Sequence, residues 1–233
     1  MTRPLKEQLH HLSRSARQLL ELEKSFERGM LETGPRRRLR DKRQQPLESA
    51  SWETLRQEVA SCTQCVLHRS RTQTVFGEGK LDAALLFVGE APGMEEDLQG
   101  RPFVGQAGKL LTKIIEAIGL KREEVYIANV LKCRPPGNRG PFPEEVRACG
   151  SYLEKQIDWI RPRVICSLGK YACLVLVRKE GTISALRGQF YDYRGIPVMP
   201  TFHPAYLLRN PSAKRLVWDD MKKIKVALEK SVA

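Results

Sequence analysis

Four short and almost uninterrupted apolar runs, at 84–89, 125–130, 164–169 and 196–202, constrain the fold of this chain more than any other feature. Segments with helical periodicity lie between and around them, at 52–61, 107–118, 143–160, 170–178 and 218–230. Strands without a polar face are typical of a parallel sheet that helices cover on both sides. We therefore predict an α/β fold, a three-layer α/β/α sandwich around a central four-stranded, mainly parallel sheet.

The first 48 residues have a different character, and we predict a boundary there. Residues 1–48 would form a basic helical extension and linker, and residues 49–233 one α/β domain. Apolar residues recur in the extension at helical spacing, at Leu5, Leu9, Leu12, Ala16, Leu19, Phe26 and Met30. This face predicts either a partner-binding or coiled-coil seam, or a helix packed on its own domain. The basic run at 36–43 is typical of a solvated linker, and it can also hold DNA phosphates.

The balance of charge points to a polyanionic partner. Forty Lys and Arg against 27 Asp and Glu give a net charge of +13 and a pI near 9.7. Nucleic acid is the commonest partner of such chains, ahead of anionic membranes. No apolar stretch reaches the ~20 residues that span a bilayer. The N-terminus has no signal-peptide core, so we expect a cytoplasmic protein. We also expect the protein to be a monomer.

Two polar residues follow predicted strands at points where ligand chemistry collects. Glu90 follows the run 84–89, and His203 follows the run 196–202. In an open parallel sheet the carboxyl ends of the strands converge on one crevice. A carboxylate and an imidazole delivered there make a plausible general base and electrophile.

Four of the six cysteines have the spacing of a metal centre. Cys62 and Cys65 form a C-x2-C pair, and Cys133 and Cys149 follow as distant single residues. Four thiolates on one face of the domain suit zinc or an iron–sulfur cluster, and one pair with two single cysteines favours a [4Fe–4S] cluster. Cys166 and Cys173 lie in an apolar strand and helix, which favours buried structural thiols.

From residue 52 onward the chain resembles the family 4 uracil-DNA glycosylases, the iron–sulfur branch of that superfamily. The resemblance rests on the runs 89–108, 129–139 and 203–211 and on the four cysteines. It implies an enzyme that flips uracil out of DNA, hydrolyses its N-glycosidic bond and leaves an abasic site. It also implies a structural [4Fe–4S] cluster.

The resemblance assigns roles to three residues of the base pocket. Phe103 would be the aromatic platform, although a core phenylalanine is the alternative. Asn129 would read the uracil edge with a donor and an acceptor, or else cap the next loop. His203 would donate a hydrogen bond to the carbonyl oxygen that gains charge as the bond breaks.

Two carboxylates compete for the remaining catalytic role. Glu90 is the better candidate to orient or activate water, and Glu96 would act in catalysis or wall off the thymine methyl group. Ala91 stands where the best-known branch of the superfamily has an aspartate, and we assign it to substrate binding. Asn138 would assist in the pocket or hold a phosphate.

The same resemblance predicts the face that meets DNA. Arg134, Arg139 and Arg209 would contact DNA, the first two from the segment that the cluster ties down. A competing hypothesis is a non-catalytic uracil-DNA or polymerase-associated binding protein that docks through its N-terminal helix. A redox or metal-storage protein is a third, but it leaves the matching runs around Glu90, Phe103, Asn129 and His203 without an explanation.

Overall fold

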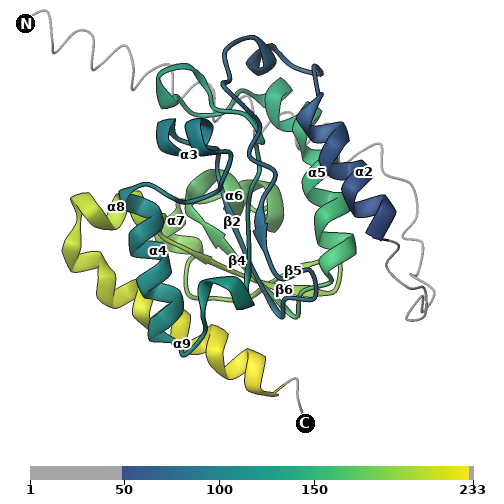
Figure 1. Ribbon diagram of the computed structural model, residues 1–233. Helices are drawn as coiled ribbons and strands as arrows, with labels where there is room; N and C mark the ends of the chain where they lie inside the picture. Colours follow the sequence, from purple (N-terminus) through teal and green to yellow (C-terminus); the bar gives the residue numbers. More distant parts are fainter. Residues whose placement is uncertain (1–48, 231–233) are drawn as a thin grey trace, which may run out of the picture.

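The computed structural model describes residues 49–230 (Figure 1). The predicted helix face and basic run of the extension lie outside the described residues, and the proposed boundary after residue 48 stays a prediction. None of the helices between residues 49 and 230 is long and apolar enough to cross a membrane.

One mixed sheet of six strands forms the centre of the described chain. Its order is β1-β3-β2-β4-β6-β5. The strands are β1 (Glu78–Gly79), β2 (Leu85–Gly89), β3 (Tyr126–Asn129), β4 (Val164–Leu168), β5 (Tyr191–Tyr193) and β6 (Ile196–Thr201). The four predicted strands are the inner ones, and they are mutually parallel. The α/β class and the parallel core are therefore confirmed.

The predicted number of strands was too small, because each edge carries a short antiparallel strand. β1 pairs with β3 over two residues, and β5 pairs with β6 over three. The residues of these strands are at least partly exposed, apart from Tyr193. Their sequences lack the continuous apolar run from which the inner strands were predicted. Only the pairing with a neighbour makes them strands.

Eight α-helices occur in the described chain: α2 (Ser49–Ala60), α3 (Met94–Gln99), α4 (Gln106–Ala117), α5 (Pro143–Ile160), α6 (Gly169–Val177), α7 (Ile183–Leu186), α8 (Pro204–Arg209) and α9 (Lys214–Lys230). Short 3-10 turns lie at Val66–Arg69, Arg122–Glu124, Pro136–Asn138 and Pro211–Ala213. The helix predicted at 143–160 is confirmed at both ends, where Pro143 opens it and Arg161 closes it in a left-handed conformation. The last helix begins at 214 rather than 218, and the short helices α3, α7 and α8 were not predicted.

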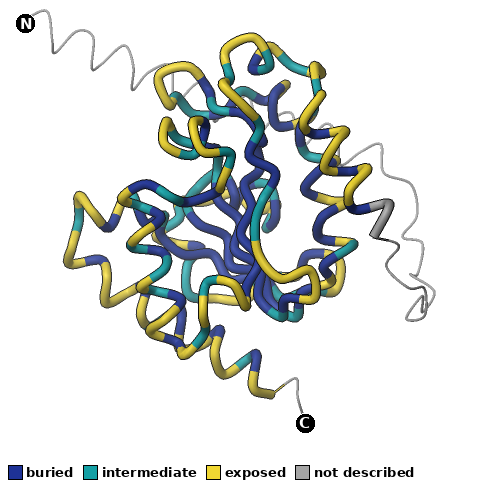
Figure 2. Tube along the Cα trace, in the orientation of Figure 1, coloured by how far each residue is buried: buried dark blue, intermediate teal, exposed yellow. Residues whose placement is uncertain are grey.

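Helices cover both faces of the sheet, as the uniformly buried strands require. Leu86 and Val88 point into a core shared with α2, α5 and α6, whereas Leu85 and Phe87 point into a second core shared with α4 and α9. Figure 1 shows α2 and α5 on one side of the sheet and α4 and α9 on the other, and Figure 2 shows the strands buried between them. The predicted three-layer sandwich is confirmed.

Candidate active site at the carboxyl edge of the sheet

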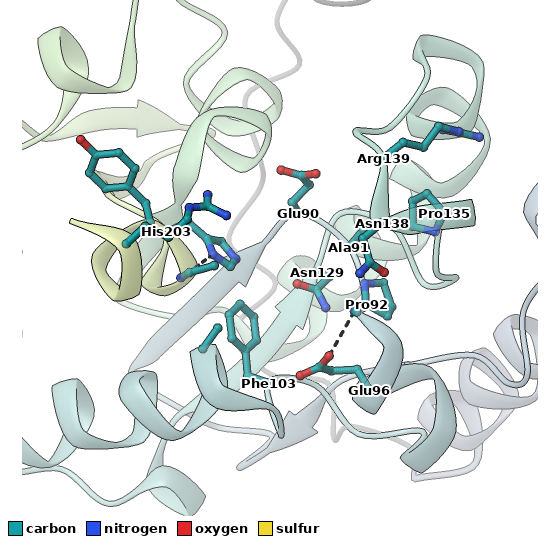
Figure 3. A pocket seen from close by; sticks show the side chains of 15 residues that line it. Glu90, Ala91, Pro92, Glu96, Phe103, Asn129, Pro135, Asn138, Arg139 and His203 are labelled. Atoms are coloured by element: carbon teal, nitrogen blue, oxygen red, sulfur yellow. Dashed lines mark hydrogen bonds between the residues drawn. The ribbon is translucent and has the colours of Figure 1, made fainter. Parts of the chain in front are cut away.

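A cavity of about 440 Å³ opens where β2, β3 and β6 end. That volume lies in the range of ~300–1,000 Å³ typical of small-molecule sites. Figure 3 shows the side chains that surround it. The predicted site residues in its wall are Glu90, Ala91, Glu96, Phe103, Asn129, Asn138, Arg139, His203 and Arg209. Of the residues predicted for substrate or DNA, only Arg134 is not part of this wall.

Asn129 presents a free acceptor to this cavity. The residue ends β3 and is 2% exposed, and its Oδ1 has no hydrogen-bond partner in the described chain. The parallel register sets Gly89 of β2 beside it. A Cβ at Gly89 would lie 2.3 Å from Asn129 Oδ1 and 2.5 Å from Phe103 Cζ, so only glycine leaves room for both side chains. A buried amide oxygen without a partner is destabilising by about 1–3 kcal/mol, which a ligand donor would relieve.

Phe103 is held in a conformation that few residues of its type adopt. Its φ is +50°, in the left-handed region. Gly108 permits this turn, because a Cβ there would lie 1.9 Å from the Phe103 carbonyl oxygen. The ring packs in the second core and also forms part of the cavity wall, with its centroid 5.5 Å from that of the His203 ring.

Glu96 holds the loop that carries Phe103. Its Oε1 accepts hydrogen bonds from the backbone N–H groups of Val104 (2.9 Å) and Gly105 (3.0 Å), and its Oε2 accepts one from Gly93 (3.1 Å). Figure 3 shows this carboxylate at the cavity wall beneath Pro92. Three backbone donors occupy the carboxylate, so its direct effect is on the geometry of the two loops.

His203 is arranged as a neutral hydrogen-bond donor. It is the N-cap of α8, and its Nδ1 accepts a hydrogen bond from the backbone N–H of Ala205 at 3.1 Å. The proton of the neutral ring therefore resides on Nε2. Burial lowers the pKa of His203 to about 4, and the nearby Glu96 charge opposes this shift only partly.

Glu90 has the opposite perturbation. It follows directly after β2, and burial raises the pKa of its carboxyl group to about 7. No hydrogen bond or ion pair holds this carboxylate among residues 49–230. Its charge also contributes, after burial, to raising the pKa of Tyr171 to about 12. A carboxyl group in a cavity whose pKa lies near neutral pH is typical of a general base.

The three predicted DNA-binding arginines have different surroundings. Arg139 donates two hydrogen bonds to the buried carboxylate of Glu145 and lies over the Phe142 ring at 3.6 Å. Arg134 donates to Asn138 Oδ1 at 2.7 Å, and Arg209 is exposed at the end of α8. Arg134 and Arg209 are therefore accessible to a phosphate, whereas Arg139 is engaged inside the protein.

The four predicted cysteine ligands gather around one separate small cavity. Cys62, Cys65, Cys133 and Cys149 all line it, and their thiols are free. Polar hydrogens point at two of the sulfurs: Arg71 Nη1 lies 3.3 Å from Cys133 Sγ, and the Lys132 backbone N–H lies 3.3 Å from Cys149 Sγ. Burial outweighs these N–H groups, which lower the pKa of the two thiols, so the pKa of Cys133 is raised and that of Cys149 is raised to about 12.

The four sulfurs do not form a compact single-ion site as they lie. Across residues 49–230, no group of three or more His, Cys, Asp or Glu side chains is close enough together to hold a metal ion. Four thiols around a shared cavity are a donor set that both zinc and iron–sulfur clusters use. The remaining cysteines, Cys166 and Cys173, are buried as predicted.

Sequence reasoning missed three residues that support these sites. Gly89 stands between Asn129 and Phe103, Arg71 bonds to Cys133, and Lys132 lies buried beside Cys149. A signal existed for Lys132, since it immediately precedes a predicted ligand. Nothing in the local sequence around Arg71 marks it.

A cavity at the carboxyl edge of parallel strands, lined by an aromatic ring, an amide, an imidazole and a carboxylate, is typical of an enzyme site and has the groups to bind a flat heterocycle. The chain belongs to the uracil DNA glycosylase superfamily, whose sequence model matches residues 76–222. Within it the chain is similar to the Type-4 uracil-DNA glycosylase of Thermotoga maritima, at 50% identity over 76% of this chain and 95% of the relative. The predicted resemblance is confirmed.

Two further relatives locate the chain within the superfamily. The Type-4 uracil-DNA glycosylase of Sulfurisphaera tokodaii is 47% identical over 75% of this chain and 84% of its own length. A Type-5 uracil-DNA glycosylase of Pyrobaculum aerophilum is 30% identical over 63% and 71%, respectively. The greater identity is thus to the Type-4 proteins.

Proposed function

We propose that this protein is a uracil-DNA glycosylase of DNA repair, which releases uracil from DNA and leaves an abasic site. The observation that carries the proposal is the unpaired Oδ1 of Asn129, buried in a cavity with Phe103 and His203. A flipped uracil offers the N–H donor that this acceptor lacks.

Recognition would rest on the two edges of the Asn129 amide. Oδ1 accepts from uracil N3–H, and Nδ2 donates to uracil O4. Cytosine offers an acceptor and a donor in the reverse order, so both contacts fail and a buried polar group stays unpaired. The Phe103 ring, fixed by its backbone turn, stacks on the base face, and Ala91 forms part of the wall around it.

Bond cleavage would use His203 and Glu90. As the C1′–N1 bond breaks, its electron pair moves into the uracil ring and charge gathers on O2. The Nε2–H of the neutral His203 donates to that oxygen. A water oxygen bonds to C1′ while Glu90 orients the water and takes its proton, and the uracil anion is later protonated by solvent. Glu96 acts by positioning Phe103, because its oxygens are occupied by backbone donors.

The four cysteines are the residues that would hold a [4Fe–4S] cluster. These ligands would connect the 62–71 segment to the loop after β3, through Cys133, and to α5, through Cys149. Uracil-containing DNA would approach the cavity mouth, where Arg209 and Asn138 are part of the wall and Arg134, bonded to Asn138, can meet a phosphate. The cytoplasmic setting, the monomeric state and a protein partner for the extension stay predictions.

A labelled oligonucleotide with one uracil tests the activity. The iron-loaded protein is incubated with it, and half of the sample is then treated with alkali. We expect strand scission at the uracil only after alkali, as a glycosylase without lyase activity gives. An Asn129→Ala protein is the matched control, and we expect it to be slower by orders of magnitude. DNA that stays intact in the presence of fully loaded protein would favour the binding-protein hypothesis instead.

A further inference from the structure

Lys132 is a buried cation without a carboxylate partner. It is 1% exposed, and its Nζ donates to the Asn129 backbone oxygen at 2.8 Å and to Gln156 Oε1 at 2.6 Å. Both acceptors are neutral. Among residues 49–230 no Asp or Glu forms an ion pair with this ammonium group.

Burial of an ammonium group in a protein interior is strongly unfavourable unless an opposite charge lies nearby. Two partly exposed arginines show the usual solution for a buried charge: Arg139 is paired with the buried carboxylate of Glu145, and Arg187 with that of Asp220. Lys132 has no such carboxylate, so its compensating charge must come from another kind of group.

The cysteine cavity supplies that group. Lys132 forms part of the cavity wall, and its backbone N–H points at Cys149 Sγ. On the other side of the cavity Arg71 donates to Cys133 Sγ and to the Cys62 carbonyl oxygen. Lys132 and Arg71 are thus both part of the wall of the cavity that the four cysteines line.

We propose that Lys132 is the buried counter-ion of the anionic thiolate-ligated cluster held by Cys62, Cys65, Cys133 and Cys149. The inference rests on the proposed cluster and not on the glycosylase chemistry. An iron–sulfur core with four thiolates is a net anion, and nearby charge sets its reduction potential. Because the same ammonium group binds the Asn129 carbonyl oxygen, the cluster and the base-reading strand end share one buried cation.

Redox titration of the iron-loaded protein tests this role. Visible absorbance follows the one-electron reduction of the cluster in wild type, Lys132→Met, Lys132→Gln, Lys132→Arg and a control, Lys113→Met, at an exposed position of α4. Lys132→Met and Lys132→Gln remove the cation, so adding an electron becomes less favourable and the midpoint potential becomes more negative. Lys132→Arg keeps the positive charge, and its potential stays near the wild-type value. The control leaves the potential unchanged.

The variants at position 132 distinguish an electrostatic role of Lys132 from a purely hydrogen-bonding role. If Lys132 only anchors Asn129 and Gln156 by hydrogen bonds, Lys132→Met and Lys132→Gln leave the potential of the loaded cluster at the wild-type value, which overturns the proposal. Lys132→Gln keeps a hydrogen-bond donor without the charge, so it gives this comparison even if Lys132→Met does not fold. A wild-type protein that binds no iron would overturn the cluster and the counter-ion together. Iron-loaded protein that fails to release uracil would contradict the glycosylase activity alone.

Discussion

His203 is a neutral donor at physiological pH because two features of its surroundings act together. The first turn of α8 donates to Nδ1 and leaves the proton on Nε2, while burial lowers the pKa to about 4. A protonated imidazole would have to give up the Ala205 hydrogen bond. The residue type suggests an acid or base, but the environment makes His203 an electrophile.

We predict that His203→Ala lowers the rate of uracil release by about 10²–10³-fold, the usual loss for one donor to a developing oxyanion. Single-turnover cleavage of the uracil oligonucleotide measures it. In Glu90→Gln, where the carboxyl titration is absent, no loss of the remaining activity should be centred near pH 6.5, because the His203 ring stays neutral until the pH approaches 4. A drop in rate centred near pH 6.5 in that variant would contradict the neutral donor.

Glu90 gives a second prediction, on pH dependence. Its pKa is raised from 4.5 to about 7, so a base role requires the rate to rise with pH up to about 7 and then level off. Glu90→Gln should lower the plateau and remove this rise. A profile of kcat/KM from pH 5 to 9 measures both. Wild-type and Glu90→Gln profiles of the same shape would exclude Glu90 as the titrating base.

The same shift has a consequence for stability. Because the folded pKa of Glu90 lies above its unfolded value, the folded state binds more protons between about pH 4.5 and 7. Wild type therefore loses stability relative to Glu90→Gln as the pH rises through that window. Urea unfolding of both proteins at pH 5 and pH 8 should show the difference, and an equal gap at the two pH values would contradict it.

At the scale of elements, the six-residue helix α3 connects two parts of the structure that lie far apart in the sequence. Glu96 at its start bonds three backbone donors, and Asp97 next to it accepts both hydrogen bonds of the Thr72 N–H, one to each oxygen. Thr72 directly follows Arg71, which reaches the cysteines. α3 thus joins the loop that carries Phe103 to the cysteine segment.

We predict that Glu96→Ala destabilises the protein by about 1–3 kcal/mol, because buried backbone donors lose their acceptor. It should also weaken binding of free uracil as a product inhibitor, since the Phe103 loop loosens. Glu96→Gln keeps an acceptor oxygen and should retain more of both properties, with the pH profile of wild type. Denaturant unfolding and product inhibition measure them. A Glu96→Gln protein of normal stability that lacks activity would instead show a catalytic carboxylate.

At the scale of the whole molecule, the proposed active site and part of the positive charge lie in different segments of the chain. The proposed catalytic residues and all four cysteines lie between residues 62 and 203, while the run 36–43 adds positive charge outside them. Contacts between basic side chains and phosphates release counterions, so their contribution to affinity depends on salt.

We predict that a chain lacking residues 1–48 cleaves bound uracil DNA at the wild-type rate but binds DNA more weakly. The slope of log affinity against log salt should also become shallower. Fluorescence anisotropy between low and physiological salt, beside single-turnover cleavage, separates the two effects. A folded truncated protein without cleavage activity would place part of the site in the extension.

Removal of one cysteine ligand is the matching test of the cluster. Cys133→Ser should lose the brown visible absorbance and lower the melting temperature, because the cavity then lacks a ligand beside Arg71. Cys173→Ser changes a buried thiol of α6 that lies outside the cysteine cavity and should keep the colour. Iron content and absorbance measure both.

The sequence by itself determined the inner sheet and the identity of the residues that surround the cavity. Buried parallel strands require continuous apolar runs, and these runs are visible without a structure. Because parallel strands end at one edge, Glu90, Asn129 and His203 had to approach one another. The start of α5 was likewise legible, because a proline and two glutamates open the helix.

Only the tertiary structure decided what each of these residues can do. The β1 and β5 edge strands exist through their pairing, and the proton of His203 is placed by a helix that forms after it. The carboxylate of Glu96 is occupied by donors up to nine residues away, and Lys132 is buried between β3 and α5. Protonation, free lone pairs and uncompensated charge depend on which groups surround an atom in space, and that is a property of the packed chain.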